Sequence, residues 1–259
     1  MTNDADRKRD VATAFSAATD GYRDGAVLKE GDDLERLVDW CSDATRALDV
    51  ATGAGHVAGG LVDAGVSRVV AADLSPEMVR TATTEYPRVE GVAVDAERLP
   101  FAANQFDAVT CRFAAHHFPD PEAFLAEVER VLAPGGVFAL EDLCVPDDPE
   151  LAAYVNRLER LRDPGHVETY SSSQWRGWLE AAGLTVDAVQ ETSRRLEVDA
   201  WLDRMDVPAD RRREIRASLA DAPAALEDAF EFEYETDGDG DGQRLTSYRT
   251  GVSLFRATA

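Results

Sequence analysis

From about residue 45, short apolar runs with the character of β-strands alternate with stretches of helical character. The predicted strands cover residues 45–51, 67–73, 89–95, 106–112 and 136–143. The predicted helices between them cover residues 55–64, 75–86 and 120–132. Strands that alternate with helices are joined by crossover connections. The pattern therefore predicts a parallel sheet with helices on both faces.

The ends of these helices carry local signals that support the same assignment. Ser75-Pro76-Glu77 places a capping residue before a proline at the first helical position. Asp120-Pro121 repeats that arrangement, and Pro134-Gly135 supplies a stop after the third helix. Both helix starts follow directly on a strand or loop of the predicted sheet.

The remaining segments extend this core on both sides. Helices are expected at 4–20 and 32–40, then at 148–162, 172–182, 198–205 and 209–230, with further strands at 184–191 and 244–256. We expect an α/β fold with a seven-stranded, mostly parallel sheet. Residues 1–44 are expected to form an N-terminal helical lid, in which Tyr22 would fold over the ligand. Residues 45–259 are expected to form one domain with a helical cap insertion around 198–230.

The charge of the chain indicates the salt conditions in which the protein works and the class of partner it can bind. It carries 50 acidic and 27 basic residues, for a net charge of -23, and its only lysines are Lys8 and Lys29. Dense carboxylates keep a protein surface hydrated at molar salt, so the composition predicts a cytoplasmic protein of a halophile. The same charge disfavours nucleic acid as a partner, because phosphate contacts need a basic surface.

Other classes of protein find no support in the sequence. No apolar run approaches the ~20 residues of a membrane span, and the first residues lack the apolar segment of a secretory signal. Three cysteines in separate segments give neither a disulfide framework nor a metal cluster. The alternating Asp-Gly tract at 237–242 lacks the downstream Glu of a calcium loop, so we interpret it as a turn and expect no metal.

The most informative segment is Asp49-Val-Ala51-Thr52-Gly53-Ala-Gly55, in which a buried strand runs into a glycine loop that opens a helix. Small residues let the backbone approach a ligand, and the first N–H groups of a helix suit an anionic group. Taken alone, Gly53-x-Gly55-x-x-Ala58 also satisfies the dinucleotide-binding fingerprint. The motif by itself is therefore ambiguous.

Acidic residues at the ends of the next two strands reduce the ambiguity. Asp73 follows Gly55 by 18 residues, where a carboxylate can accept both hydroxyls of a ribose. Met78, shortly after it, is placed to lie against an adenine. Asp95 ends the third strand and offers a carboxylate to an exocyclic amine, and Arg112 ends the fourth.

This succession of motifs resembles the class I S-adenosylmethionine-dependent methyltransferases, and within them the branch that contains the ubiquinone and menaquinone C-methyltransferases. The core resemblance covers residues 48–143, and a looser one extends along most of the chain. It implies a Rossmann-like fold and S-adenosyl-L-methionine as the cofactor. The implied donor-binding residues are Asp49, Ala51, Thr52, Gly53, Gly55, Asp73, Leu74, Met78, Asp95, Ala96 and Arg112. Ala51 departs from the family, which has its first glycine there, so donor affinity could differ.

The sequence gives fewer signals for the acceptor site than for the donor site. His116 and His117 follow the fourth strand, and we expect one of them to be a catalytic base or to orient the acceptor. Arg162, His166 and Tyr170 lie after the fifth strand, where acceptor pockets are often completed, and with Tyr22 and His117 they are the candidate substrate-binding residues. The motifs of nucleic-acid methyltransferases are absent from the sequence. A small molecule, quinone-like or phenolic, is the favoured acceptor class.

Two other functions stay open at this stage. A donor-binding protein without catalysis would carry the same motifs. An NAD-dependent oxidoreductase would also use the glycine loop and Asp73, although the absence of any lysine after Lys29 disfavours a Tyr-Lys catalytic pair. The sequence does not identify the methylated atom, and a homodimer is compatible with it.

Overall fold

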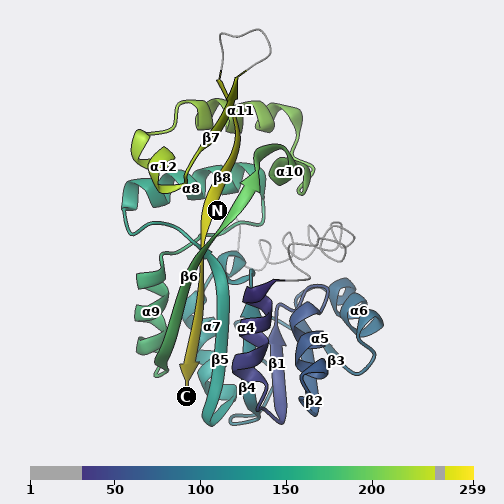
Figure 1. Cartoon of the computed structure of the whole chain (residues 1–259). Helices are drawn as coiled ribbons and strands as arrows, with labels where there is room; N and C mark the ends of the chain where they lie inside the picture. Colours follow the sequence, from purple (N-terminus) through teal and green to yellow (C-terminus); the bar gives the residue numbers. More distant parts are fainter. Residues whose placement is uncertain (1–30, 237–242) are drawn as a thin grey trace.

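A mostly parallel sheet forms the centre of the protein in a computed structural model, which describes residues 31–236 and 243–259 (Figure 1). The strands are β1 (Arg46–Val50), β2 (Arg68–Asp73), β3 (Glu90–Ala93), β4 (Phe106–Arg112), β5 (Leu132–Cys144), β6 (Thr185–Glu197), β7 (Glu233–Thr236) and β8 (Gln243–Thr258). Their order is β3-β2-β1-β4-β5-β8-β6, and β7 pairs with β8 off this path. Strands β1 to β5 are parallel, whereas β8 runs antiparallel to both β5 and β6. The predicted seven-stranded sheet is confirmed, and β7 is an addition to it.

Helices cover both faces of this sheet. They are α4 (Asp32–Cys41), α5 (His56–Asp63), α6 (Pro76–Glu85), α7 (Pro121–Val131), α8 (Pro149–Arg162), α9 (Ser172–Ala181), α10 (Val198–Asp203), α11 (Ala209–Ala220) and α12 (Ala224–Ala229), with a short 3-10 helix η1 (Ala115–His117). Those predicted from 32 to 182 begin and end within two residues of their expected bounds. The predicted helix at 4–20 lies outside the described residues.

Alternate residues of the strands face two separate cores. Ala47 of β1 packs with Leu37 of α4 and Leu61 of α5 on one face. Leu48, the next residue, packs with Phe124 of α7 and other side chains on the opposite face. This alternation is the two-residue period of a strand. It explains why the central strands are apolar almost throughout.

Local capping fixes where two of the helices begin. The Ser75 side chain accepts a hydrogen bond from the Met78 backbone N–H, with Pro76 at the first helical position. Asp120 accepts from the Ala123 N–H in the same way before α7. Each cap satisfies an N–H group that has no partner inside its helix.

A third apolar cluster lies beyond the carboxyl end of the sheet, at the top of Figure 1. We call it the cap; it consists of α8, α10, α11, α12, β7 and the outer parts of β6 and β8. The single helix expected at 209–230 is wrong, because Pro223 interrupts it and separates α11 from α12. Strand β6 continues past its expected end at residue 191 to Glu197, since β8 pairs with it along its whole length.

The expected lid falls largely outside the described residues, Tyr22 among them, so its role stays a prediction. The part that is described, α4, packs on α5 and on the sheet. Among the described residues, no helix has the length and apolarity that a bilayer crossing requires.

Candidate active site

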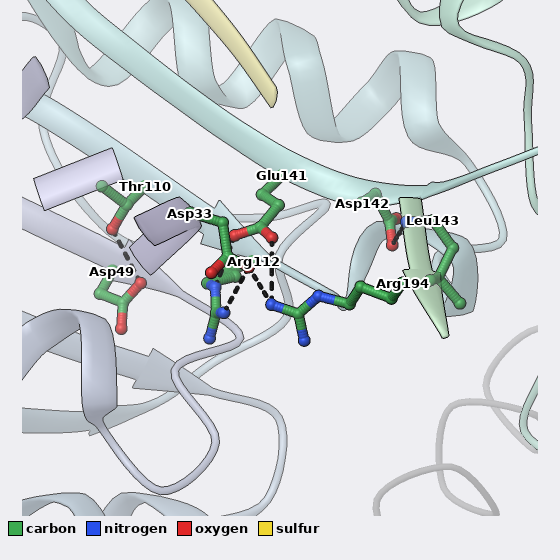
Figure 2. Close-up of polar contacts among 8 residues, drawn as sticks. All are labelled: Asp33, Asp49, Thr110, Arg112, Glu141, Asp142, Leu143 and Arg194. Carbon is green, nitrogen blue, oxygen red and sulfur yellow. Dashed lines mark hydrogen bonds and ion pairs between the residues drawn. The ribbon is translucent and has the colours of Figure 1, made fainter. Parts of the chain in front are cut away.

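The loop after β1 is held by a buried carboxylate. Asp49 is 1% exposed, and its two oxygens accept hydrogen bonds from Thr52 Oγ1 at 2.6 Å and from Thr110 Oγ1 at 2.8 Å (Figure 2 shows the second). Burial raises the pKa of Asp49 to about 6, against the opposing effect of the two hydroxyl groups. Asp49 therefore links the glycine loop to β4 and lies at the wall of the cavity described below.

Three residues of this loop have left-handed backbone: Ala51 (φ 52°), Gly53 (φ 53°) and Gly55 (φ 87°). Such angles cost glycine little but strain a residue with a Cβ. At Gly55 a Cβ would lie 2.8 Å from the Ala82 Cβ of α6, so a side chain is also excluded by space. Ala51 occupies a conformation that favours glycine, which explains why the resembling family has glycine at that position.

Asp73 braces the glycine loop against the loop after β2. Its Oδ2 accepts from the Gly53 N–H at 2.9 Å, and its Oδ1 accepts from the Ser75 N–H at 2.8 Å. Burial raises the pKa of this carboxyl group, and the backbone N–H groups partly oppose the shift. The side chain thus connects the ends of two adjacent parallel strands at the carboxyl edge of the sheet.

A cavity opens above this edge, and its empty space, with adjoining open solvent included, amounts to about 1190 Å³. Of the donor-binding residues expected from sequence, all but Gly55 line it, and the acceptor-side candidate His117 lines it too. Gly55 instead packs against α6 and shapes the start of α5. The remaining lining residues, which the sequence analysis missed, flank the same motifs: Val50, Ala54, His56, Val57, Ala72, Val94, Glu97, Phe113, Ala114, Phe118 and Pro119.

The wall of the cavity combines carboxylates with apolar side chains. Asp49, Asp73, Asp95 and Glu97 contribute four acidic groups. Met78, 1% exposed, contributes an apolar surface at the start of α6. Such a mixture suits a ligand that has hydroxyl groups, an amine, a flat apolar ring and a positive charge. Among the described residues, no cluster of His, Cys, Asp or Glu has the arrangement of a metal site.

The two adjacent histidines occupy different places. His117 lines the cavity. His116 lies behind it, where its Nδ1–H donates to Asp142 Oδ1 at 2.6 Å. The ring centroids are 4.2 Å apart. Of the pair expected to include a catalytic residue, the structure therefore puts His117 alone at the cavity.

Three further candidates for substrate binding, Arg162, His166 and Tyr170, do not line the cavity. Arg162 donates to Glu159 and stacks on Trp201 in the cap. His166 bonds Asn156 through its Nε2, and Tyr170 packs edge to face against Trp175 and Trp178. None of the three lines the cavity, and of its described lining residues none belongs to the insertion at 198–230.

A partly buried network of four charged side chains borders the cavity (Figure 2). Arg112 donates from Nε to Glu141 Oε2 at 2.5 Å and from a terminal nitrogen to Asp33 Oδ2 at 3.0 Å. Arg194 of β6 also donates to Asp33. Both guanidinium groups lie over the ring of Phe113, at 4.8 and 4.6 Å from its centroid. The network joins α4, β4, β5 and β6 and holds one wall of the cavity.

Protonation of Glu141 follows from this arrangement. The residue is fully buried, and its Oε1 accepts no hydrogen bond from the described residues, but it lies 3.8 Å from a terminal nitrogen of Arg194. Burial and the neighbouring Asp33 raise the pKa of Glu141 to about 8, although Arg112 opposes the shift. Burial also raises the pKa of Asp33, but Glu141 and the two arginines outweigh it and lower that pKa below its usual range. Near neutral pH the pair therefore carries one negative charge rather than two.

Comparison with known proteins agrees with the fold. Residues 48–140 match the model of a methyltransferase domain. The chain is 38% identical over 225 residues to the uncharacterized methyltransferase YcgJ of Bacillus subtilis, covering 84% of this chain and 88% of that protein. A demethylmenaquinone methyltransferase of Renibacterium salmoninarum is 41% identical over 116 residues, 44% of this chain and 48% of that protein.

Solved structures extend the likeness to nearly the whole fold. A candidate methyltransferase from Bacillus halodurans superposes with a TM-score of 0.82 at 33% identity, covering 88% of this chain and 99% of that one. The structure of YcgJ itself gives a TM-score of 0.80, also at 33% identity, and covers 87% of this chain and 97% of that one.

Proposed function

Because the chain belongs to the methyltransferase family that includes YcgJ, we propose that it transfers a methyl group from S-adenosyl-L-methionine to a small molecule. The observation that carries the proposal is the convergence of Asp49, Asp73 and Asp95, from the ends of three parallel strands, on one cavity beside a glycine loop. Ligands of open α/β sheets bind at this edge.

Each part of the donor molecule can be matched to residues that line the cavity or the loops beside it. Asp73 would accept hydrogen bonds from the ribose hydroxyls, and Met78 would pack against the adenine. Asp95 and Ala96 would meet the adenine amine. The loop at 53–55 and Asp49 would hold the methionine part. The positive end of the α5 dipole, beside the glycine loop, suits the methionine carboxylate. Acidic side chains in the wall also favour the positive sulfonium.

When bound, the donor supplies an electrophilic methyl group on sulfur, and the transfer needs alignment and exclusion of water more than it needs acid-base chemistry. The chain's own contribution is therefore the cavity wall. Phe113, Phe118 and Pro119 provide apolar surface beside His117. An acceptor hydroxyl that must lose its proton would meet a histidine there.

We further propose a quinone-like or phenolic acceptor. The apolar surface next to His117 suits a flat ring with a hydroxyl group, and part of the chain is similar to the demethylmenaquinone methyltransferases. A donor-binding protein without catalysis is the alternative. It would bind the donor equally well but release no S-adenosylhomocysteine with any acceptor.

Isothermal titration with S-adenosylhomocysteine in molar KCl tests the donor site, with NAD as the control ligand. Micromolar binding of the first and none of the second is expected. Asp73→Ala removes two charge-assisted hydrogen bonds to the ribose, so we expect a loss of affinity of about a hundredfold or more. Asp63→Ala is the matched control, since Asp63 is exposed on α5 outside the cavity lining.

The outcomes distinguish a methyltransferase from an NAD-binding protein and from a donor-binding protein without catalysis. Unchanged affinity in Asp73→Ala, or binding of NAD alone, would overturn the assignment of the donor. Turnover is then tested by release of S-adenosylhomocysteine from S-adenosylmethionine with a panel of phenols, quinols and quinones. Donor binding without release for any acceptor would favour the non-catalytic alternative.

A further inference from the structure

His117 reaches the cavity from η1, whereas its neighbour His116 is bound to Asp142 of β5. We propose that Asp142 and His116 are a positioning pair that keeps His117 neutral and in a single tautomer at the cavity wall. The proposal rests on the proposed function, because it concerns the site where donor and acceptor would meet. Neither Asp142 nor His116 is expected to touch either ligand.

Asp142 holds His116 by main chain and side chain at once. Its Oδ2 accepts from the His116 backbone N–H at 2.9 Å, and its Oδ1 accepts from the His116 Nδ1–H at 2.6 Å. The same Oδ1 accepts from the Leu143 N–H at 2.8 Å, a contact drawn in Figure 2. Asp142 is 1% exposed. A buried carboxylate in this position orients the imidazole and stabilises its protonated form.

The loop after α8 fixes the tautomer of His117. The His117 Nδ1–H donates to the Gly165 carbonyl at 3.0 Å, so in the neutral ring the lone pair is on Nε2. The same loop also binds His116, because the His116 carbonyl accepts hydrogen bonds from the Val167 and Glu168 N–H groups. The two rings are therefore held from both sides, with centroids 4.2 Å apart.

The surroundings of the pair shift the pKa values of the two histidines in opposite directions. Burial lowers the pKa of His116, but Asp142 outweighs it and the net shift is upward. Burial, and then the charge on His116, lower the pKa of His117 to about 4, against the attraction of Asp163. The charged and titratable groups that face the pair are Asp142 on β5, Glu159 on α8, and Asp163 and His166 on the following loop. Protonation is thus favoured on His116, away from the cavity, over His117.

A neutral His117 matters for the chemistry of this cavity. A sulfonium donor is a cation, and a second positive charge at the same wall would repel it. A protonated imidazole could not accept a proton from an acceptor hydroxyl either. By favouring protonation of His116 over His117, the pair meets both requirements.

The chain has only four histidines, so nuclear magnetic resonance of the imidazole nitrogens can follow each one during a pH titration of the whole protein without ligand. We expect His117 to show one neutral tautomer, protonated at Nδ1, down to about pH 5. His116→Gln removes the neighbouring charge and retains Asp142, so the pKa of His117 should rise by about one pH unit or more. Asp142→Asn lets His116 become neutral and should raise it less.

The control is His56→Gln: the His56 ring bonds the Tyr86 hydroxyl and is not part of the contacts around His116 and His117, so this variant should leave the titration of His117 unchanged. If His117 titrates near its ordinary value in the wild type, or if neither His116→Gln nor Asp142→Asn moves its pKa, the proposal is overturned. Should one variant fail to fold, the other carries the test. The titration needs no donor, so its result is independent of the binding experiment on Asp73.

Discussion

Gly53 and Gly55 both have left-handed backbone, at φ 53° and 87°, but their surroundings differ. A Cβ built on Gly53 meets nothing within 4 Å. A Cβ on Gly55 would lie 2.8 Å from the Ala82 Cβ, 3.0 Å from the Ala82 Cα and 3.1 Å from Tyr86 Cδ2. Alanine at each position therefore separates backbone strain from steric exclusion.

The expected magnitudes follow from these contacts. A left-handed backbone conformation destabilises the folded state of an alanine variant by about 1–2 kcal/mol. Replacing glycine by alanine also lowers the conformational entropy of the unfolded chain, which stabilises the folded state by about 0.4–1 kcal/mol. Gly53→Ala should thus lower the free energy of unfolding by about 1 kcal/mol. Gly55→Ala adds overpacking of about 1–3 kcal/mol, because the Ala82 contact includes the backbone of α6. Its total should be about 2–4 kcal/mol.

Thermal unfolding followed by circular dichroism in molar KCl measures both variants. With about 2–4 °C of Tm per kcal/mol for a domain of this size, Gly55→Ala should lower the Tm by about 5–15 °C and Gly53→Ala by only a few degrees. Equal losses, or a larger loss for Gly53→Ala, would refute the argument that α6 excludes a side chain at Gly55.

Two further variants test strain and charge. Ala51→Gly removes the left-handed strain at φ 52°, so urea unfolding should show a free energy unchanged or raised by up to about 1 kcal/mol; a clear decrease would contradict the strain. Glu141→Gln mimics the protonated acid. The pKa of Glu141 is raised above its unfolded value to about 8, so the wild type should lose stability relative to this variant as the pH rises from about 5 to 8. A pH-independent difference in urea unfolding would show that Glu141 is ionised throughout.

The sheet and the loops that line the cavity could be predicted from sequence because their signals are local. A parallel strand buried on both faces is a short apolar run, as Leu48 and its neighbours show, and the cavity-lining residues Asp73 and Arg112 are the last residues of such runs. Ser75-Pro76 and Asp120-Pro121 marked the helix starts for the same reason: a cap and its helix are adjacent in the chain.

The rest of the site depends on contacts between distant segments. Asp33 meets Arg112 across 79 positions and Arg194 across 161, and no local pattern pairs them. The two histidines were not distinguished, since neighbouring residues of a 3-10 turn point in directions about 120° apart and only the fold shows which faces the cavity. Strand β7 was missed although Phe232, Tyr234 and the glutamates beside them alternate apolar and polar residues with the two-residue period of a strand.

Strand β8 lies between β5 and β6, although it follows β5 by about 100 residues in the chain. During synthesis at about 5–20 residues per second, the edge of β5 next to Leu140 would wait about 5–20 seconds for its partner. An unpaired apolar edge is a template for association with other chains. The position of β8 therefore delays completion of the sheet until about 100 residues beyond β5 have been synthesised, and it leaves the apolar edge of β5 unpaired until then.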